Sequence, residues 1–380
     1  MRVLLDYRAA LRQRSGVGEY THELARALLA RARARAGPGA FELSLFSSSL
    51  RDRLRVDARL DGARAIDRRV PVRVLNFAWH RLEQPTAEWL TGGTYDVAHS
   101  MHPLLMPTRH AAQVVTIHDL NFLTHPERTR AEIRRDYPAL VRQHAHRADR
   151  IVAVSAFTAS EIVRLLDVPP ERISVCIAGA PSWPARTEPP ADGGYLLFFG
   201  TLEPRKNVGV LLDAYERLVQ RRHDIPPLVL AGRATAEAAP WLERIARSPL
   251  AGRARHIGYV APEDRQALYA GATLLVQPSF EEGFGLPVLE AMTVGVPVVA
   301  ANRGALPEVL GTAGLLVDAT DPDAFAAAIE RFIDHPDEAR AAVENGLTRA
   351  REFSWTRTAD QTMTAYDAAI AARAARSSAA

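Results

Sequence analysis

The sequence has 380 residues, which is enough for two or three domains of ordinary size. Hydrophobic residues make up 47% of it and charged residues 24%, a composition that excludes a disordered or fibrous protein. The formal net charge is only +3, and no apolar run approaches the roughly 18 to 20 residues that span a bilayer.

Short apolar runs alternate with amphipathic helical stretches along the whole length, which is typical of parallel sheets built from βαβ units. In the first half we expect strands at 2–7, 41–46, 96–100, 113–118 and 150–155. A proline-rich stretch then predicts a linker. Strands are expected to resume at 195–199, 227–231, 255–258, 273–277, 296–300 and 314–317.

These elements predict an α/β protein with two doubly wound domains of the Rossmann type. The first domain would span 1–183, the linker 184–194 and the second domain 195–355, with an alanine-rich helix at 356–380. Ligands of such folds bind at the carboxyl ends of the strands, so we expect the site in the cleft between the domains.

The charge is divided unevenly between the two halves of the chain. Residues 1–189 contain 28 Arg and 20 acidic residues, a net charge of +8, whereas the remainder carries −5. This asymmetry predicts that the first half meets an anionic membrane surface or a lipid phosphate, or else that its helices have solvated basic faces. No nucleic-acid-binding motif accompanies the arginines, so no nucleic-acid partner is expected.

Other features of the composition concern the compartment. The single cysteine, Cys176, excludes an intramolecular disulfide, and the first 20 residues lack the apolar core of a secretory signal. We therefore expect a cytoplasmic location, with peripheral contact at the inner face of the membrane as a further expectation.

The segment SGVGEY (15–20) follows the first predicted strand and precedes a helix predicted from Thr21. Gly16 and Gly18 would let the backbone approach a phosphate beside the helix N-terminus. Thr21 stands where a dinucleotide fingerprint has its third glycine, and no acidic residue ends the next strand. We therefore expect a turn that lies near a phosphate or is purely structural, rather than a nicotinamide-binding site.

The segment GTLEPRKN (200–207) places two cations at the carboxyl end of a predicted strand, just before a helix. Arg205 offers a planar fork and Lys206 a compact point charge, a combination that suits a diphosphate. A solvated turn would also explain two cations. It does not explain why Lys206 is the one lysine among 47 basic residues.

The segment FEEGFGLPVLEAM (280–292) predicts a loop and the first turns of a helix. The amides of Phe284, Gly285 and Leu286 would form an anion nest, and Glu282 and Glu290 would accept hydrogen bonds from sugar hydroxyls. The alternatives are two solvated charges near a helix start or a glycosidase acid/base pair. The neighbouring cations favour hydroxyl binding.

Histidines and acidic pairs complete the candidate groups. His118 ends a buried strand, which favours a site residue over a structural histidine, whereas His144 and His146 are predicted at the surface. Asp321 and Asp323 match a metal-binding spacing but precede a helix, so N-capping explains them better. No metal site is expected.

Together these segments resemble the retaining glycosyltransferases of family 4, which have the GT-B fold. The matching residues are SGVGEY (15–20), TIHDL (116–120), IVAVSAFTASEI (151–162), GTLEPRKN (200–207), HIGYV (256–260), PSFEEGFGLPVLEAM (278–292) and PVVAANRGALPEVLG (297–311). They occur in the family's order over nearly the full length, and the spacing of Glu282 and Glu290 is the most specific. HDL at 118–120 resembles mannosyltransferase-type members that build bacterial polysaccharides.

The resemblance implies a role for each matched residue. Arg205 and Lys206 would hold the donor diphosphate with the amides of Phe284, Gly285 and Leu286. Glu282 would bind donor-sugar hydroxyls, Glu290 the nucleotide ribose, and His118 the transferred sugar. The remaining implied donor contacts are Gly16, Gly18, Thr201, Gly258, Tyr259 and Val260. In this family the final helix commonly crosses back onto the first domain.

The resemblance further implies a retaining, metal-independent hexosyltransferase without a cofactor. The expected donor is a nucleotide sugar, GDP-mannose before a UDP-sugar, and the expected acceptor is a saccharide or a lipid-linked saccharide in polysaccharide or glycolipid synthesis. With no carboxylate placed as a nucleophile, front-side transfer is expected. A nucleotide-sugar epimerase of the same fold is the alternative function, and a sugar-nucleotide binding protein without catalysis is disfavoured by the complete set of cations and carboxylates.

Overall fold

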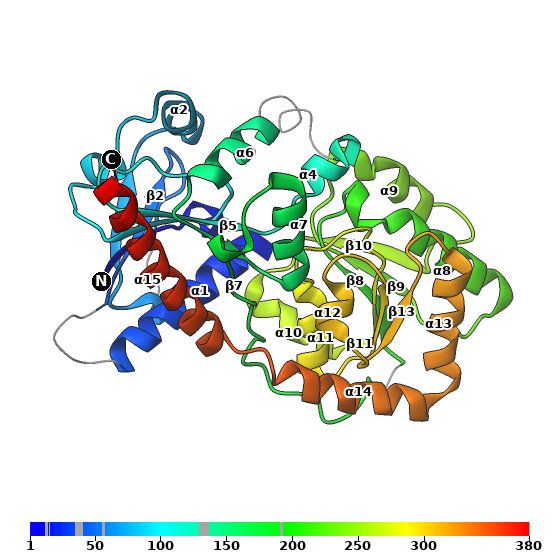
Figure 1. Cartoon of the computed structure of the whole chain (residues 1–380). Coiled ribbons are helices and arrows are strands. Elements are labelled where there is room, and N and C mark those ends of the chain that lie inside the picture. Colours follow the sequence, from blue (N-terminus) through cyan, green and yellow to red (C-terminus); the bar gives the residue numbers. More distant parts are fainter. Residues whose placement is uncertain are drawn as a thin grey trace. The chain divides into compact units, whose positions relative to one another are not determined.

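The computed structural model describes residues 1–11, 14, 16–34, 41–54, 58–128, 137–190 and 193–379 (Figure 1). The chain forms two compact units. Unit 1 comprises Met1–Pro126, Arg130–Gly179 and Ser354–Ala380, and unit 2 comprises Glu127–Thr129 and Ala180–Phe353.

Unit 1 is built on a seven-stranded parallel sheet with the strand order β3-β2-β1-β4-β5-β6-β7. Its strands are β1 Arg2–Asp6, β2 Glu42–Ser48, β3 Arg64–Arg68, β4 Val97–Ser100, β5 Ala112–Ile117, β6 Arg150–Ala153 and β7 Ile173–Val175. Every residue of β5 is buried, as expected of a strand covered on both faces. The order reverses direction at β1, so the sheet is doubly wound.

The helices of unit 1 connect these strands and cover both faces of the sheet. They are η1 Arg8–Ala10, α1 Gly16–Ala34, η2 Ala58–Leu60, α2 Val72–Phe77, η3 Ala78–Leu82, α3 Ala87–Thr91, α4 Asn121–Thr124, α6 Tyr137–Arg147, α7 Ala156–Leu166, η5 Pro170–Arg172 and α15 Trp355–Ala379. The short helix η4 Pro126–Arg128 begins on the last residue of one unit 1 segment and continues into unit 2. Ser155 caps α7 by accepting a hydrogen bond from the Thr158 amide.

The C-terminal helix α15 packs on unit 1, beside α1 (Figure 1). The hydroxyl of Tyr366 lies 2.8 Å from Nδ1 of the buried His99 on β4, although the two residues are 267 positions apart in the sequence. At the helix surface, Nε of Arg31 on α1 donates to Asp360 at 2.8 Å. The last helix of the chain thus completes the core of the first unit.

Unit 2 contains a six-stranded parallel sheet with the order β10-β9-β8-β11-β12-β13. Its strands are β8 Tyr195–Phe199, β9 Leu228–Ala231, β10 Ala254–Gly258, β11 Ala272–Gln277, β12 Val298–Ala301 and β13 Leu315–Val317. Its helices are η6 Pro204–Lys206, α8 Val208–Arg221, η7 Ala236–Ala238, α9 Ala239–Ile245, α10 Pro262–Ala270, α11 Leu286–Val294, α12 Leu306–Leu310, α13 Pro322–Asp334 and α14 Pro336–Ala350. The prediction of two doubly wound α/β sheets is confirmed.

Several local predictions differ from the structure. Strands β3 and β7 were not predicted; both are short edge strands, and β3 buries only Ile66. Helix α1 begins at Gly16 rather than at Thr21, and Ser15 of the glycine segment lies outside the described residues. The surface prediction for His144 is wrong, because the ring is 3% exposed and its Nδ1 accepts a hydrogen bond from the Leu105 amide at 2.8 Å.

The proline-rich segment 184–194 packs on unit 2 where the structure describes it. The Arg186 amide donates to the carbonyl of Val294, and its guanidinium donates to the carbonyl of Ala272 at 2.5 Å. Asp321 caps α13 by accepting from the amides of Asp323 and Ala324 at 2.9 and 3.0 Å. The prediction that this acidic pair begins a helix is confirmed.

Candidate functional site

The predicted cation and carboxylate of unit 2 form one buried pair. Lys206 ends η6, which follows β8, and Glu282 lies in the loop that follows β11. Because β8 and β11 are neighbours in the sheet, their carboxyl ends bring the two residues together. Nζ of Lys206 donates to both carboxylate oxygens of Glu282 at 2.6 and 2.7 Å. Lys206 is 7% exposed and Glu282 is 5% exposed.

Three further side chains surround the carboxylate of Glu282. Its Oε1 accepts hydrogen bonds from Ser279 Oγ at 2.7 Å and from Gln277 Nε2 at 2.9 Å. Arg205 Nη1 lies 3.8 Å from Oε2. The roles of Ser279 and Gln277 were missed in the sequence; the available signal was a polar residue at the end of the apolar strand β11.

The electrostatics of this cluster favour the ionised carboxylate. Burial by itself would raise the pKa of Glu282, but the charges of Lys206 and Arg205 and the hydrogen bonds from Lys206 and Ser279 outweigh it. The pKa of Glu282 is therefore held below its ordinary value. Two of the three N–H donors of Lys206 serve Glu282, which leaves one donor for another acceptor.

Asn207 fixes the turn that carries Lys206. Its backbone is left-handed, with φ of 54°, a conformation that asparagine tolerates better than most residues. Its side-chain amide donates to the carbonyls of Pro278 and Ala319 at 3.0 and 2.7 Å. The turn after β8 is thus bound to the loop after β11, which keeps the Lys206–Glu282 geometry in place.

The loop 283–285 leads into α11 through Gly285, whose φ is +101°. A Cβ at this position would also lie 2.9 Å from the Leu306 side chain. A residue larger than glycine would therefore suffer both an unfavourable backbone conformation and a steric clash. Within the described part of the chain, no acceptor bonds the amides of Phe284, Gly285 and Leu286. Amides without an acceptor are what an anion nest requires, and the nest itself stays a prediction.

Glu290 lies one turn inside α11 and contacts two residues of α10. The Tyr269 hydroxyl donates to its Oε2 at 2.7 Å, and Arg265 Nη1 lies 3.6 Å from its Oε1. The Arg265 guanidinium also lies over the Phe199 ring, 5.7 Å from the centroid. Glu290 is 5% exposed, so the alternative that both glutamates are solvated charges is wrong. Tyr269 and Arg265 were not predicted.

The strand ends beside β8 approach each other closely. Gly232 follows β9 with φ of +134°, and a Cβ there would lie 1.9 Å from the Gly200 carbonyl oxygen, so only glycine fits. The next residue after Gly200 is Thr201, which is half-buried. At the end of β10, the half-buried Gly258, Tyr259 and Val260 follow one another, and the Arg233 guanidinium lies 5.6 Å from the Tyr259 ring centroid.

In unit 1, His118 follows β5 and packs edge-on against Tyr20, with ring centroids 5.3 Å apart. Burial lowers the pKa of His118 to about 4, so its imidazole is neutral at neutral pH. No hydrogen-bond partner of its buried Nε2 occurs among the residues that the structure describes.

The two glycines of the first turn differ in their surroundings. A Cβ at Gly16 would meet nothing within 4 Å, whereas one at Gly18 would lie 2.6 Å from the Ala9 carbonyl oxygen. The packing of α1 against η1 therefore accounts for Gly18 without a ligand.

A charged cluster that sequence reasoning missed lies at the end of β1. The Arg8 guanidinium donates to the buried Asp6 from Nε at 2.8 Å and from Nη2 at 2.6 Å. His102 Nε2 lies 3.3 Å from the same carboxylate. Burial opposes ionisation, but Arg8 and His102 hold the pKa of Asp6 well below its ordinary value. The aspartate ending the first apolar strand was the available signal.

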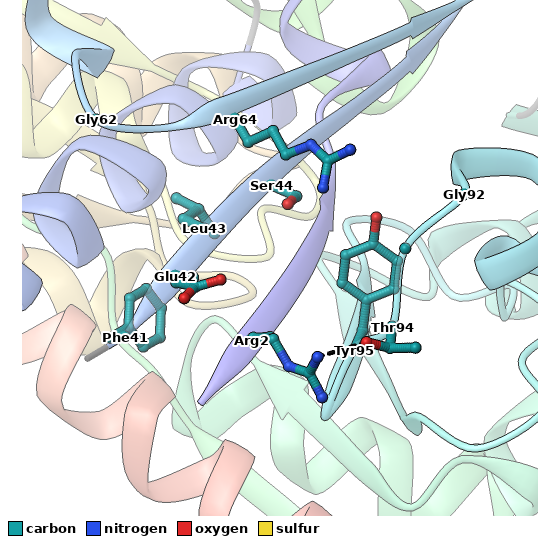
Figure 2. Close-up of a pocket in the computed structure, with 11 residues that line it drawn as sticks. Arg2, Phe41, Glu42, Leu43, Ser44, Gly62, Arg64, Gly92, Thr94 and Tyr95 are labelled. Atoms are coloured by element: carbon teal, nitrogen blue, oxygen red, sulfur yellow. Dashed lines mark hydrogen bonds between the residues drawn. The ribbon is translucent and has the colours of Figure 1, made fainter. Parts of the chain in front are cut away.

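A cavity of about 620 Å³ opens at the amino ends of the strands of the same sheet, opposite to this cluster (Figure 2). Arg2, Glu42 and Arg64, which line it, are the first residues of β1, β2 and β3. None of the predicted site residues is among its lining residues. The predicted groups instead follow the carboxyl ends of strands.

Two further kinds of feature do not occur in the described ranges. They contain no helix that is long and apolar enough to cross a membrane. Among the same residues, no three His, Cys, Asp or Glu side chains are grouped so that they could hold a metal ion.

Comparisons with known proteins agree with this architecture. Residues 14–177 match the description "Glycosyltransferase Family 4", and residues 193–335 match "Glycosyl transferases group 1". An O-antigen chain mannosyltransferase B of Escherichia coli is 37% identical over 299 residues, which cover 76% of this chain and 78% of that protein.

Among solved structures, sucrose-phosphate synthase from Thermosynechococcus elongatus is 20% identical and superposes with a TM-score of 0.78, covering 97% of this chain and 98% of that one. HepE of Anabaena, solved with UDP-glucose, is 18% identical and has a TM-score of 0.68, covering 95% of this chain and 98% of that one. These two likenesses concern the fold.

Proposed function

Because the chain belongs to glycosyltransferase family 4, we propose that it transfers mannose from GDP-mannose to a saccharide or lipid-linked acceptor with retention of the anomeric configuration. The proposal depends on the buried Lys206–Glu282 pair and the nearby amides of 284–286. Together they offer a cation, an anion nest and an acceptor for a sugar hydroxyl at the carboxyl ends of neighbouring strands. The mannosyl donor is inferred from the name of the 37% identical relative.

In unit 2, the diphosphate would take the remaining donor of Lys206, the fork of Arg205 and the amides of Phe284, Gly285 and Leu286. Oε2 of Glu282, which accepts a hydrogen bond from Lys206, would also accept one from a sugar hydroxyl. Glu290 would bind the ribose. The residues proposed to line the rest of the donor are Thr201, Gly258, Tyr259 and Val260.

In unit 1, the neutral His118 with its unbonded Nε2 would hydrogen-bond the transferred sugar. Gly16 and Gly18 would lie near the diphosphate and the acceptor. The net charge of +8 in residues 1–189 supports an acceptor with a lipid phosphate and peripheral contact with the cytoplasmic face of a membrane.

In the proposed reaction, the bond between the anomeric carbon and the diphosphate oxygen breaks while the acceptor oxygen bonds to the same face of the sugar. The acceptor's proton passes to the leaving phosphate oxygen, so no protein base is required. Arg205, Lys206 and the amides stabilise the charge that develops on the nucleoside diphosphate, the step where fixed electrostatics contribute most. The proposal includes no metal and no cofactor.

Incubation with GDP-mannose, with and without a panel of saccharide acceptors, tests this function. We expect α-linked mannoside product with retained configuration, undiminished by EDTA, and a larger thermal shift with GDP-mannose than with UDP-glucose. An inverted anomeric centre would refute the retaining mechanism. Conversion of the donor to an epimeric nucleotide sugar without an acceptor would instead support an epimerase. A preference for UDP-glucose would mean that the donor is a UDP-sugar and not GDP-mannose.

Replacing Tyr269 with phenylalanine is expected to raise the Kd for GDP-mannose about tenfold while kcat changes less than about twofold. The change removes the hydroxyl that donates to Glu290 Oε2 at 2.7 Å and so releases the proposed ribose-binding carboxylate. Calorimetric titration of the donor measures the effect.

Tyr215→Phe is the matched control for this prediction. The Tyr215 hydroxyl is in the same unit and donates to the carbonyls of Pro226 and Arg253, both at 3.0 Å. The Tyr215→Phe variant should lose about as much free energy of unfolding as Tyr269→Phe, and its affinity for the donor should not change. Equal donor affinity in both variants would mean that Tyr269 only packs α10 on α11.

A further inference from the structure

An arginine without a charged partner lies at the carboxyl ends of β9 and β10. Arg233 follows β9 and is exposed, and its side chain forms no ion pair or hydrogen bond with any residue that the structure describes. Its guanidinium instead lies 5.6 Å from the ring centroid of Tyr259, which follows β10. An arginine that stacks on an aromatic ring keeps its N–H donors free for a ligand.

The backbone that carries Arg233 is fixed to the strand ends on both sides. Its carbonyl accepts a hydrogen bond from the Leu202 amide at 2.7 Å, and the Thr235 hydroxyl donates to the Leu202 carbonyl at 2.9 Å. Toward β10, the Gly232 amide donates to the Gly258 carbonyl at 2.7 Å. The position of Arg233 is therefore well defined, although its side chain extends into solvent.

The backbone beside this guanidinium is open. The pairing of β10 with β9 shifts register between His256 and Gly258. Apart from the chain neighbours of Gly258, no described atom lies within 4 Å of the position that a Cβ would take there. The amides and carbonyls of Tyr259 and Val260 form no hydrogen bond with the described residues. A flat ring can thus lie along this backbone, within reach of Arg233.

These strand ends lie at a suitable distance from the proposed diphosphate site. Neighbouring strands are about 4.8 Å apart, and β9 lies between β8 and β10, so the ends of β8 and β10 are roughly 10 Å apart (Figure 1). A nucleoside spans such a gap. With its diphosphate at Lys206, after β8, a nucleotide would have its base beside Arg233 and Tyr259. This placement rests on the proposed function.

The planar fork of an arginine distinguishes one base from the others. Guanine presents two neighbouring acceptors, O6 and N7, which match two parallel N–H donors of a guanidinium. Adenine has a donor in place of O6, and uracil, like thymine, offers only O4 on the corresponding edge. We propose that Arg233, oriented by Tyr259, binds O6 and N7 of guanine and thereby selects a guanosine diphosphate sugar as the donor.

Calorimetric titration of the full chain with GDP, 7-deaza-GDP and UDP tests this assignment. The analogue 7-deaza-GDP has a C–H in place of N7 and keeps the shape of the base. The parent chain should bind GDP roughly 5- to 150-fold more tightly than UDP, which is the range that one bidentate contact supplies. It should bind GDP about tenfold more tightly than 7-deaza-GDP. Arg233→Ala should weaken GDP binding and bring the ratio of the two purine affinities close to one.

Three further variants separate the fork from its charge. Arg233→Lys keeps the positive charge without the fork, so the preference for GDP over 7-deaza-GDP should still fall. Arg255→Ala is the matched control, because it removes an exposed arginine near the amino end of β10 and should leave all three affinities unchanged. Tyr259→Leu should reduce the preference for GDP in part, because the guanidinium loses the ring that orients it. Thermal unfolding checks that every variant folds.

The outcome is separable from the proposed function. An equal loss of affinity for GDP, 7-deaza-GDP and UDP in Arg233→Ala would mean that the arginine only stacks on the nucleotide or attracts its charge, and would overturn the assignment. A parent chain that binds UDP as tightly as GDP would also overturn it. In both cases, turnover of GDP-mannose with an acceptor would leave the proposed reaction in place. A parent chain that binds no nucleoside diphosphate would refute the proposed reaction and the base assignment together.

Discussion

Lys206→Ala is expected to lower kcat/KM for the donor by about 10²–10³-fold. The variant removes the buried ammonium that donates to both oxygens of Glu282, 2.6 and 2.7 Å away, and whose third donor is proposed to hold the diphosphate. It also leaves the Glu282 carboxylate buried without its main counter-charge. Breaking such a pair from one side costs about 3–5 kcal/mol of stability, so the free energy of unfolding must be measured beside activity.

The double variant Lys206→Met, Glu282→Gln separates folding from function. The neutral amide introduced at position 282 could still accept hydrogen bonds from Ser279 and Gln277, so no unpaired charge is buried and most of the lost stability should return. Activity and donor affinity should remain low. If donor affinity returned together with stability, the pair would be a structural ion pair and the diphosphate assignment would be wrong. Lys206→Arg should rescue only partly, because the planar fork cannot reproduce the point contact.

Unit 1 is expected to lose stability steeply as the pH falls from about 6.5 to 4. Burial lowers the pKa of His99 and of His80 to about 3, and that of His118 and of His144 to about 4. Each pKa is lower in the folded chain than in the unfolded chain, so the unfolded state binds more protons within this window. The stability is fully present above the unfolded pKa and is lost as the pH falls toward the folded one.

His99 should make the clearest contribution, because its ring is fully buried between Tyr366 and Thr116, 2.8 Å from each hydroxyl. A titrating group of this kind contributes a slope of about 1.4 kcal/mol per pH unit. His99→Gln should remove that slope from urea unfolding curves recorded across the window. Thr116→Val is the control, since it removes a hydrogen-bond partner of the ring but keeps the titrating group. A His99→Gln variant with an unchanged slope would contradict the assignment.

The main features of the fold were predictable because they depend on local sequence patterns. Continuous apolar runs such as the residues of β5 and β11 indicate strands covered on both faces, and the amphipathic stretches between them indicate crossover helices. The edge strands β3 and β7 escaped prediction because an edge strand needs few apolar residues; its hydrogen bonds to a neighbour define it.

The candidate site was predictable residue by residue, but its interactions were not. Lys206 and Glu282 were each singled out from the sequence as ligands of different parts of a donor, and the structure shows that they bind each other. Arg265 and Tyr269 looked like ordinary residues of an amphipathic helix, and only the packing of α10 on α11 places them against Glu290. His144 looked like a surface residue because its helix is rich in charge.

The sequence by itself determined the α/β class, the order of the strands along the chain and the identity of the charged residues at strand ends, because these follow from periodicity and composition over a few residues. The tertiary structure alone decided which of those charges are paired, which histidines are buried and which apolar side chains are left in water. Pairing and burial depend on contacts between residues far apart in the chain, such as Tyr366 with His99 or Lys206 with Glu282. No local pattern carries that information.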